Sequence, residues 1–334
     1  MRLVECVPNF SEGREPEIIN KISATIEAVD GVKLLHVDSG YDVNRTVMTF
    51  IGSPEQVGIA AFNAIAKAYE LVDMAKQSGT HPRMGSTDVC PFIPVSNVTI
   101  EECLDLARNV ARRVGDELGI PVYLYEKSAT QPERQNLADI RRGQYEGLPE
   151  KLKLKEWKPD FGPTEFNPKA GATVMGVREF LIAYNINLNT RDIRLASQIA
   201  GMLRATGYKD INKQKIPGKF QCCKAIGWVV DEFDRAQISM NLTDYKVTPI
   251  HVVMEEARNL AADLGLVVTG SEIIGMIPYD ALLATGKYYL QKQGQSTFIA
   301  IRDILETAIQ SLGLRDCTSF IIKDKVLGLP DDFC

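Results

Sequence analysis

The residue best suited to move protons at neutral pH in this sequence is a histidine in an unusual stretch. His81 is one of three histidines and lies in residues 79–95, GTHPRMGSTDVCPFIPV, which also carry Asp88. Three prolines and two glycines forbid a regular helix there, and Pro82 favours an extended backbone at His81. Imidazole can carry a proton between two nitrogen atoms, while Arg83 can bind a carboxylate through paired hydrogen bonds. The pattern predicts a rigid loop that is either a reactive site or purely structural.

Four further side chains are weaker candidates for chemistry. His36 and Asp38 are two residues apart and share one face of a predicted strand. A structural polar contact for His36 and a turn hydrogen bond for Asp38 are the simpler interpretations. His251 falls in the first turn of a predicted helix, where a capping contact explains it. Cys90 could act as a nucleophile, yet its valine, proline and phenylalanine neighbours favour a buried, inert thiol.

A second unusual stretch, residues 161–173, reads FGPTEFNPKAGAT. Phe161 and Phe166 could stack on a flat ring, and Lys169 could meet an anion. The stretch lacks the G-x-G-x-x-G and Walker patterns, so a cradle for nucleotide phosphates is not indicated. It is either a ligand-binding segment beside a cleft between domains or a plain linker.

Composition excludes several classes of protein. The 334 residues are 45% hydrophobic and 24% charged, an ordinary globular balance that suggests two domains. A net charge of −5 argues against a broad nucleic-acid surface. No apolar run reaches the ~18 residues of a membrane span, and no signal peptide is expected. The seven cysteines contain no C-x-x-C pair, which favours free thiols in a reducing cytoplasm and no metal site.

Apolar periodicity and punctuation residues predict the elements of the first half. Thr99 and Glu102 form a capping box, and Gly119 is placed to end the helix that follows. The predicted elements are strand 3–9, helix 16–29, strands 32–38 and 45–51, helices 54–76 and 99–119, and strand 121–125.

The second half repeats that order. Its predicted elements are strand 178–188, helix 190–204, strands 225–230 and 237–242, helix 249–265, strand 266–269 and a helix from 278. Short strings also match between the halves, with Asn9 corresponding to Asn187 and Arg45 to Arg235. The shared order predicts a duplication, and the alternative is coincidence between two ordinary α/β domains.

We therefore predict an α+β chain of two ferredoxin-like βαββαβ subdomains, each an antiparallel sheet with helices on its outer face. The N-terminal subdomain would span 1–177 and hold the histidine loop. The C-terminal subdomain would span 178–334, with a helical tail from about residue 295. The polar segment 127–159 is a boundary, a lid or a surface extension, and the sequence leaves these alternatives open.

Four strings of the sequence resemble one enzyme family. They are LVECVPNFSEG at residues 3–13, NRTV at 44–47, HPRMG with DVCPFIPV at 81–95, and GATV at 171–174. Together they resemble glutamate formimidoyltransferase, also called glutamate formiminotransferase, from residue 1 to about 290. In animals a similar formiminotransferase domain is fused to a cyclodeaminase, and the resemblance here is to the stand-alone form.

The resemblance implies transfer of a formimino group between N-formimino-L-glutamate and tetrahydrofolate in histidine degradation. It also implies a folate tunnel between two subdomains, a cytoplasmic homodimer, tetrahydrofolate as co-substrate and no metal. His81 falls on the family's catalytic histidine. Phe166 and Lys169 would suit the pteridine ring and the folate glutamate tail. The family's folate-binding stretch falls on Gly162, Pro163, Thr164, Glu165, Phe166, Asn167, Pro168, Lys169, Ala170 and Gly171.

The implied reaction agrees with the chemistry of the residues. Amine exchange at an amidine carbon requires one nitrogen to lose a proton and the other to gain one, and neutral His81 can do both in turn. Asp38 would orient His81 or stabilise its charged form. Arg45 and Arg83 would hold substrate carboxylates.

Two alternatives stay open. A relative could transfer formyl from N-formylglutamate, because an amide differs from an amidine by one oxygen in place of NH. A non-catalytic folate-binding protein could have kept the fold, although a binding module has no need of a proton-shuttling histidine. The sequence also leaves open the polyglutamate preference, the dimer interface, the role of the tail and whether segment 127–159 moves.

Overall fold

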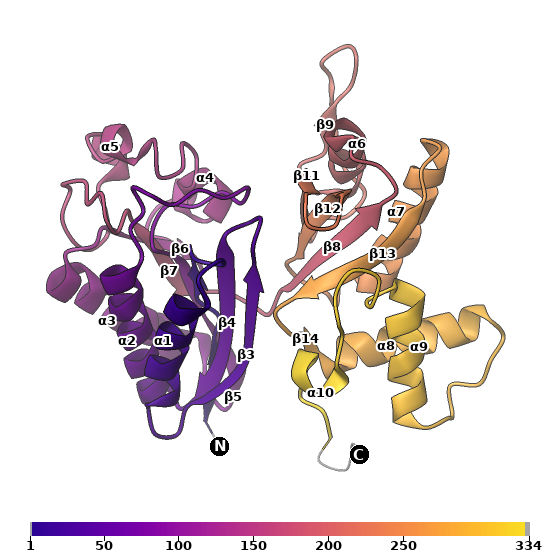
Figure 1. Ribbon diagram of the computed structural model, residues 1–334, viewed down its shortest axis with the longest axis horizontal. Helices are drawn as coiled ribbons and strands as arrows, with labels where there is room; N and C mark the ends of the chain where they lie inside the picture. The colour runs from indigo at the N-terminus through magenta and orange to yellow at the C-terminus, as the bar shows by residue number, and fades with distance from the viewer. Residues whose placement is uncertain (1, 331–334) are drawn as a thin grey trace. The chain divides into compact units, whose positions relative to one another are not determined.

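The protein divides into two compact units. The structure, a computed structural model, describes residues 2–330 and separates Met1–Glu179 (unit 1) from Phe180–Cys334 (unit 2) (Figure 1). The sequence-predicted boundary lies two residues earlier, at 177. Both units combine sheets and helices, as the predicted α+β class requires. None of the helices within residues 2–330 is both long and apolar enough to cross a membrane.

Unit 1 is built on a seven-stranded sheet. Strand β3 pairs with β4, which pairs with β1 and β2 in succession, and these pair with β5, all antiparallel. Strands β7 and β6 then extend the sheet beyond β5 in parallel. The bounds are β1 Leu3–Cys6, β2 Asn9–Phe10, β3 Lys33–Gly40, β4 Arg45–Gly52, β5 Thr87–Ser96, β6 Val122–Glu126 and β7 Thr173–Val177.

The sequence prediction was wrong over β5, where it placed a loop, and it missed β7. Residues 87–93 are all buried, so the side chains show no polar alternation that would identify a strand. Pro91 lacks a ladder donor, but its carbonyl still accepts a hydrogen bond from the Val7 N–H at 3.2 Å. Asp88 therefore lies on a central strand rather than in a loop.

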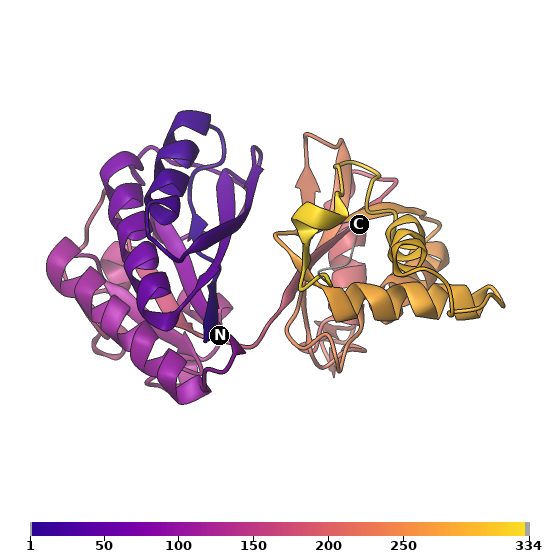
Figure 2. The same ribbon diagram turned by 90° about the horizontal axis from the view of Figure 1, so that it is seen from below.

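Three helices cover one face of this sheet: α1 (Pro16–Glu27), α2 (Pro54–Leu71) and α3 (Ile100–Leu118) (Figures 1 and 2). The capping box of α3 is confirmed, with Thr99 Oγ1 accepting from the Glu102 N–H at 3.2 Å and Glu102 accepting from the Thr99 N–H at 2.8 Å. Gly119 ends the helix in the left-handed conformation, with φ 64°. Helix α2 ends five residues before its predicted end at 76.

The other face of β5, β7 and β6 is covered by the polar segment 127–159. Its short helices α4 (Leu137–Ile140) and α5 (Leu148–Lys151) bring Ile140 and Leu148 against Val89, Tyr123 and Val174. The segment thus folds as part of unit 1 and is not the boundary between the units.

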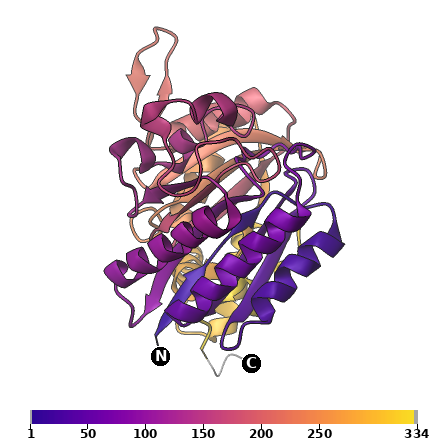
Figure 3. The same cartoon turned by 90° about the vertical axis from the view of Figure 1, so that its left-hand side faces the viewer.

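Unit 2 has a four-stranded antiparallel sheet in the order β11-β12-β8-β13. Its strands are β8 Ile182–Leu188, β11 Cys223–Val230, β12 Arg235–Leu242 and β13 Val268–Ile274, and its longer helices are α6 Ile193–Leu203, α7 Ile250–Asp263, α8 Tyr279–Lys292 and α9 Ile301–Leu312. The predicted tail forms α9, which approaches α8 closely at Gly286, where a Cβ would lie 2.0 Å from the Ile304 carbonyl oxygen. A hairpin of β9 (Tyr208–Lys209) and β10 (Lys215–Ile216) projects from the unit (Figure 3).

The two sheets share a strand order and a local irregularity. In unit 1, β1 and β2 lie between the β3–β4 hairpin and β5. In unit 2, β8 lies in the same way between the β11–β12 hairpin and β13. A register shift places Asp88 as the extra residue opposite Asn9 and Phe10, and another places Thr269 opposite Asn187 and Leu188. These correspondences favour the predicted duplication. The ferredoxin-like assignment stays a prediction, because β7 and β6 give unit 1 a parallel edge beyond it.

Candidate functional site

A buried carboxylate organises one end of the unit 1 sheet. The bulge at Asp88 turns its side chain toward Arg45, the first residue of β4, and Arg45 Nη1 donates to Asp88 Oδ2 at 2.7 Å. Arg141, which follows α4, donates to the same oxygen. The Met84 N–H donates to Asp88 Oδ1 at 2.9 Å. Two guanidinium groups thus converge on one carboxylate that is 0% exposed.

The opposite charges in this cluster act on one another's pKa. Burial alone would raise the pKa of Asp88, but Arg141 and Arg45 hold it well below its ordinary value. Burial lowers the pKa of Arg45 to about 10, although Asp88 opposes that shift. Both groups therefore stay charged at neutral pH. Arg45 Nε also donates to Asn9 Oδ1 at 3.1 Å, which fixes the plane of the guanidinium.

His81 lies beside this cluster, and burial together with the positive charges of the cluster keeps it neutral. Its Nδ1 is 2.7 Å from the Pro82 carbonyl oxygen, which can only accept, so Nδ1 carries the proton and Nε2 is the basic nitrogen. Burial lowers the pKa of His81 well below 6.5, and the positive charges of Arg45 and Arg141 lower it further. Asp88 opposes them. At pH 7 the imidazole is thus a neutral base.

The other predicted catalytic residue, Asp38, lies on the edge strand β3. His36 Nε2 is 3.5 Å from Asp38 Oδ2, so these two side chains share a face as predicted. Asp38 pairs with Val47 and Gly40 with Arg45, which places Asp38 on the sheet face that also bears Arg45. The carboxylate whose charge acts on the pKa of His81 is Asp88. An orienting role for Asp38 stays a prediction.

Arg83 contacts the protein through its guanidinium. Its Nη2 donates to Glu146 Oε1 at 2.8 Å and to the Gln77 carbonyl oxygen at 2.9 Å. It therefore joins the loop before His81 to the segment that carries Arg141. Its Nε is buried and has no hydrogen-bond partner among the described residues. Nη1 also donates to Glu146 Oε2 at 3.4 Å, so most of the guanidinium is engaged by the protein itself.

The predicted folate-binding stretch lies next to the histidine loop. Gly171 and Gly85 form an antiparallel bridge, and the Ser86 N–H donates to the Ala170 carbonyl oxygen at 2.8 Å. A side chain is excluded at Gly171, because φ is 68° and a Cβ would lie 2.1 Å from the Met84 carbonyl oxygen. The structure thus brings together two segments that are about ninety residues apart in sequence, as long-range strand pairing allows.

Two side chains assigned to folate are held against neighbouring elements. Lys169 Nζ donates to the Glu70 carbonyl oxygen at 2.8 Å near the end of α2, and it lies 5.6 Å from the centre of the Tyr69 ring. The Phe166 ring lies 5.4 Å from the ring of Tyr145. Asn167 Oδ1 closes the turn. It accepts from the backbone N–H of Ala170 at 3.0 Å and from that of Lys169 at 3.1 Å.

Comparison with known proteins identifies the family. The family described as "Formiminotransferase domain, N-terminal subdomain" matches residues 3–178, and "Formiminotransferase domain" matches residues 183–329. The chain belongs to the formiminotransferase family. Glutamate formimidoyltransferase of Streptococcus pyogenes serotype M1 is 43% identical over 87% of this chain and 94% of its own length. The same-named protein of Thermoplasma acidophilum is 46% identical over 88% of this chain and 94% of its own.

Longer relatives also match. Formimidoyltransferase-cyclodeaminase of Dictyostelium discoideum is 47% identical over 98% of this chain, which spans 60% of that protein. The family resemblance drawn from the sequence strings is therefore confirmed. The match extends to residue 329 and includes the tail, whereas the resemblance of the sequence strings ended at about residue 290.

The predicted inert thiol in this formiminotransferase-family chain is fully buried. Cys90 Sγ lies 3.5 Å from Cys6 Sγ beneath the helices, and burial raises the pKa of Cys6 well above its ordinary value. No cluster of three or more histidine, cysteine, aspartate or glutamate side chains suited to a metal ion occurs within residues 2–330.

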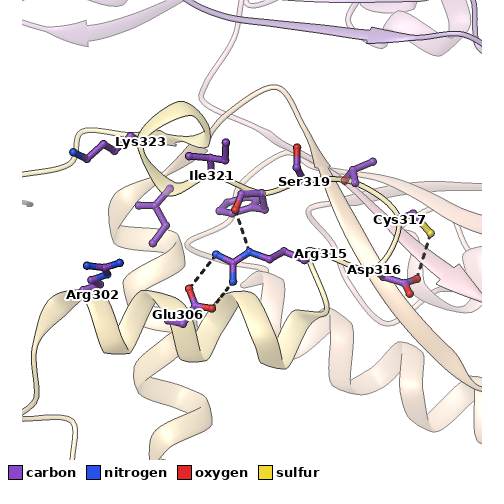
Figure 4. A pocket seen from close by; sticks show the side chains of 11 residues that line it. Arg302, Glu306, Arg315, Asp316, Cys317, Ser319, Ile321 and Lys323 are labelled. Atoms are coloured by element: carbon purple, nitrogen blue, oxygen red, sulfur yellow. Dashed lines mark hydrogen bonds and ion pairs between the residues drawn. The ribbon is translucent and has the colours of Figure 1, made fainter.

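A separate pocket of about 750 Å³ lies in unit 2 between α9 and residues 315–323 (Figure 4). Arg315 crosses it to contact Glu306 on α9 and to donate to the Phe320 carbonyl oxygen at 3.2 Å. Burial raises the pKa of Cys317 at its edge to about 11, so that thiol is protonated at neutral pH. None of the sequence-predicted site residues lines this pocket.

Sequence reasoning missed Asp88 and Arg141 as site residues. Asp88 lies in the same stretch, 79–95, as His81, but only the bulge on β5 turns its side chain toward Arg45. Arg141 lies in a segment whose polar composition suggested a surface or a linker, and no local pattern announces its contact with Asp88.

Proposed function

We propose that this chain transfers a formimino group from N-formimino-L-glutamate to tetrahydrofolate, giving 5-formiminotetrahydrofolate and L-glutamate, in histidine degradation. Family membership and the names of the relatives that match over 94% of their length support the reaction class. The observation that carries the proposal is a neutral histidine, with its basic nitrogen defined, beside a buried cluster of two cations and one carboxylate.

His81 would move one proton twice. Its Nε2 accepts the proton from the folate N5–H as the new bond from N5 to the formimino carbon forms. It then donates that proton to the glutamate nitrogen as the bond from the carbon to that nitrogen breaks. The proton and the bonds balance without any other reactant, because the two steps are amine addition and amine expulsion. The low pKa of His81 keeps the ring unprotonated and so available to accept a proton at neutral pH, and it makes the protonated form a strong donor.

The other predicted residues would bind and orient the substrates. Residues 162–171 would hold tetrahydrofolate, and their contact with the chain after His81 supports a position beside it. Arg45 and Arg83 would attract substrate carboxylates, with the Arg83 Nε–H as one unused donor. Asp38 would orient His81 or stabilise its charged form. We further propose a homodimer and a cytoplasmic location.

A steady-state assay tests the proposal. Purified protein is supplied with tetrahydrofolate and either N-formiminoglutamate or N-formylglutamate, and acid converts the folate product to its methenyl form for detection by absorbance. We expect turnover with the formimino donor and a loss of at least about 100-fold in kcat for His81→Ala, the lower range for a general acid–base. Turnover with N-formylglutamate alone would change the donor. Folate binding without turnover would favour a non-catalytic protein, and retained turnover in His81→Ala would exclude the assigned role.

A further inference from the structure

Residues 9–13, which form β2 and the turn that leads toward α1, contact the histidine loop on both sides of His81. Ser11 is 2% exposed. Its N–H donates to the Ser86 carbonyl oxygen at 2.9 Å, and its Oγ donates to the Gly85 carbonyl oxygen at 2.7 Å. These two bonds hold the backbone that follows His81, just before β5 begins.

Glu12 holds the backbone that precedes His81. Glu12 is 2% exposed, and both of its carboxylate oxygens accept hydrogen bonds. Oε1 accepts from the N–H groups of Arg14 and Glu15 at 2.8 and 3.0 Å. Oε2 accepts from Gln77 Nε2 at 2.9 Å. One carboxylate thus joins the start of α1 to a side chain four residues before the histidine.

The orientation of the Gln77 amide is fixed by its neighbours. A carboxylate cannot donate, so the Gln77 amide nitrogen must face Glu12. The Gln77 amide oxygen then accepts from Asn44 Nδ2. Asn44 Oδ1 in turn accepts from the Gly13 N–H at 2.9 Å, which leaves its nitrogen to face Gln77 and the Ser78 carbonyl oxygen. Each donor in this chain therefore meets an acceptor, and neither of the two side-chain amides can flip without placing like atoms together.

The turn itself has no room to shift. A Cβ at Gly13 would lie 2.4 Å from the Gly40 carbonyl oxygen and 2.5 Å from the Arg45 nitrogen. Thr46 Oγ1 also donates to the Glu12 carbonyl oxygen at 2.5 Å. The turn is thus fixed against the β3–β4 hairpin, whose strand β4 supplies Arg45 to the charge cluster.

We propose that residues 9–13 position the His81 loop relative to Arg45 and Asp88, with Glu12 and Gln77 as positioning residues that do not touch substrate. This inference rests on the proposed function, because its kinetic consequence needs His81 to be the proton carrier. The loop from 72 to 86 contains no helix or strand, so its shape depends on these side-chain contacts. A small displacement of a catalytic group costs a large factor in rate, of the order of 100-fold for ~1 Å.

A side-chain exchange tests the proposal. Glu12→Gln places two amide nitrogens face to face, and Gln77→Glu places two carboxylates face to face. The double variant, Glu12→Gln with Gln77→Glu, restores one donor facing one acceptor and keeps an acceptor for Asn44. We expect each single variant to lose about 10- to 100-fold in kcat, with KM for both substrates within about twofold. The double variant should recover to within about threefold of the wild type.

Hydrogen exchange of residues 77–86, followed by mass spectrometry, gives a readout that does not depend on turnover. We expect faster exchange in each single variant and wild-type exchange in the double variant. Glu117→Gln, which removes a carboxylate from the exposed pair with Arg113 on α3, is the matched control and should change neither readout.

Each outcome has a distinct meaning. Single variants with wild-type kcat and wild-type exchange would overturn the proposal, and so would a folded double variant that recovers neither. A wild type without turnover would remove the proposed function. In that case the exchange data alone would decide whether the turn holds the loop.

Discussion

Replacing Asp88 with asparagine removes the negative charge from the centre of the cluster while keeping the side-chain shape. Arg45 is 7% exposed and would then be a buried cation without its counter-ion. Removing one partner of a buried ion pair costs about 3–5 kcal/mol, because the remaining charge stays desolvated. Arg141 has a side chain 15% exposed and can turn toward solvent, so we expect the lower part of that range for Asp88→Asn at pH 7.

The pH dependence of this effect has a definite sign. Arg141 and Arg45 hold the folded pKa of Asp88 well below the unfolded value of about 3.9. The ionised carboxylate therefore stabilises the fold above about pH 4, and this contribution is lost as the pH falls toward the folded pKa. The difference in unfolding free energy between wild type and Asp88→Asn should therefore shrink as the pH falls from about 5 to about 3, a range that brackets the unfolded pKa of ~3.9.

Urea unfolding of unit 1 can be isolated by fluorescence. The chain has two tryptophans, Trp157 in unit 1 and Trp228 in unit 2. In a Trp228→Phe background the remaining tryptophan reports unit 1 alone, so the transition of the other unit does not distort the measurement. A difference below about 1 kcal/mol at pH 7, or one that grows toward acid pH, would refute the role of Asp88 as buried counter-ion.

Two further predictions concern the electrostatics of His81 and the contact between the two segments. Arg141→Met should raise the pKa of His81 toward its ordinary value, so the acid limb of kcat/KM moves to higher pH. An unmoved limb in a pH–rate profile would contradict this. Gly171→Ala should lower the melting temperature and the transfer rate, because its Cβ would lie 2.1 Å from the Met84 carbonyl oxygen. Gly294→Ala, also at positive φ but with nothing within 4 Å, is the control and should cost only about 1–2 kcal/mol.

Elements with local signals were predicted well. Helix α3 was identified from its apolar stripe, its capping box and its terminal glycine, all of which lie within the helix or next to it. The first strand and helix of each half, and the hairpins that follow, were placed within a few residues for the same reason. The predicted end of helix α2 was too late. The apolar pattern continues past Leu71, where the helix ends and the loop before His81 begins.

Strands β5 and β7 were not predictable from local pattern. Both are buried on two faces, so neither alternates between polar and apolar residues. The prolines in β5 also argue against a strand. The segment forms one because β1 and β7 pair with the rest of its backbone on either side. The segment 127–159 looked like a boundary because polar residues dominate it, yet several of its apolar side chains complete a core.

The sequence alone determined the family, the α+β class and the histidine that can carry a proton, because strings of residues and local periodicity are properties of neighbours along the chain. Tertiary structure decided which carboxylate and which cations surround His81. Asp88, Arg45 and Arg141 come from a bulge, a strand start and a distant segment, and they meet only when the sheet has formed. The pKa of His81 depends on that meeting, since charge interactions act across space and not along the sequence.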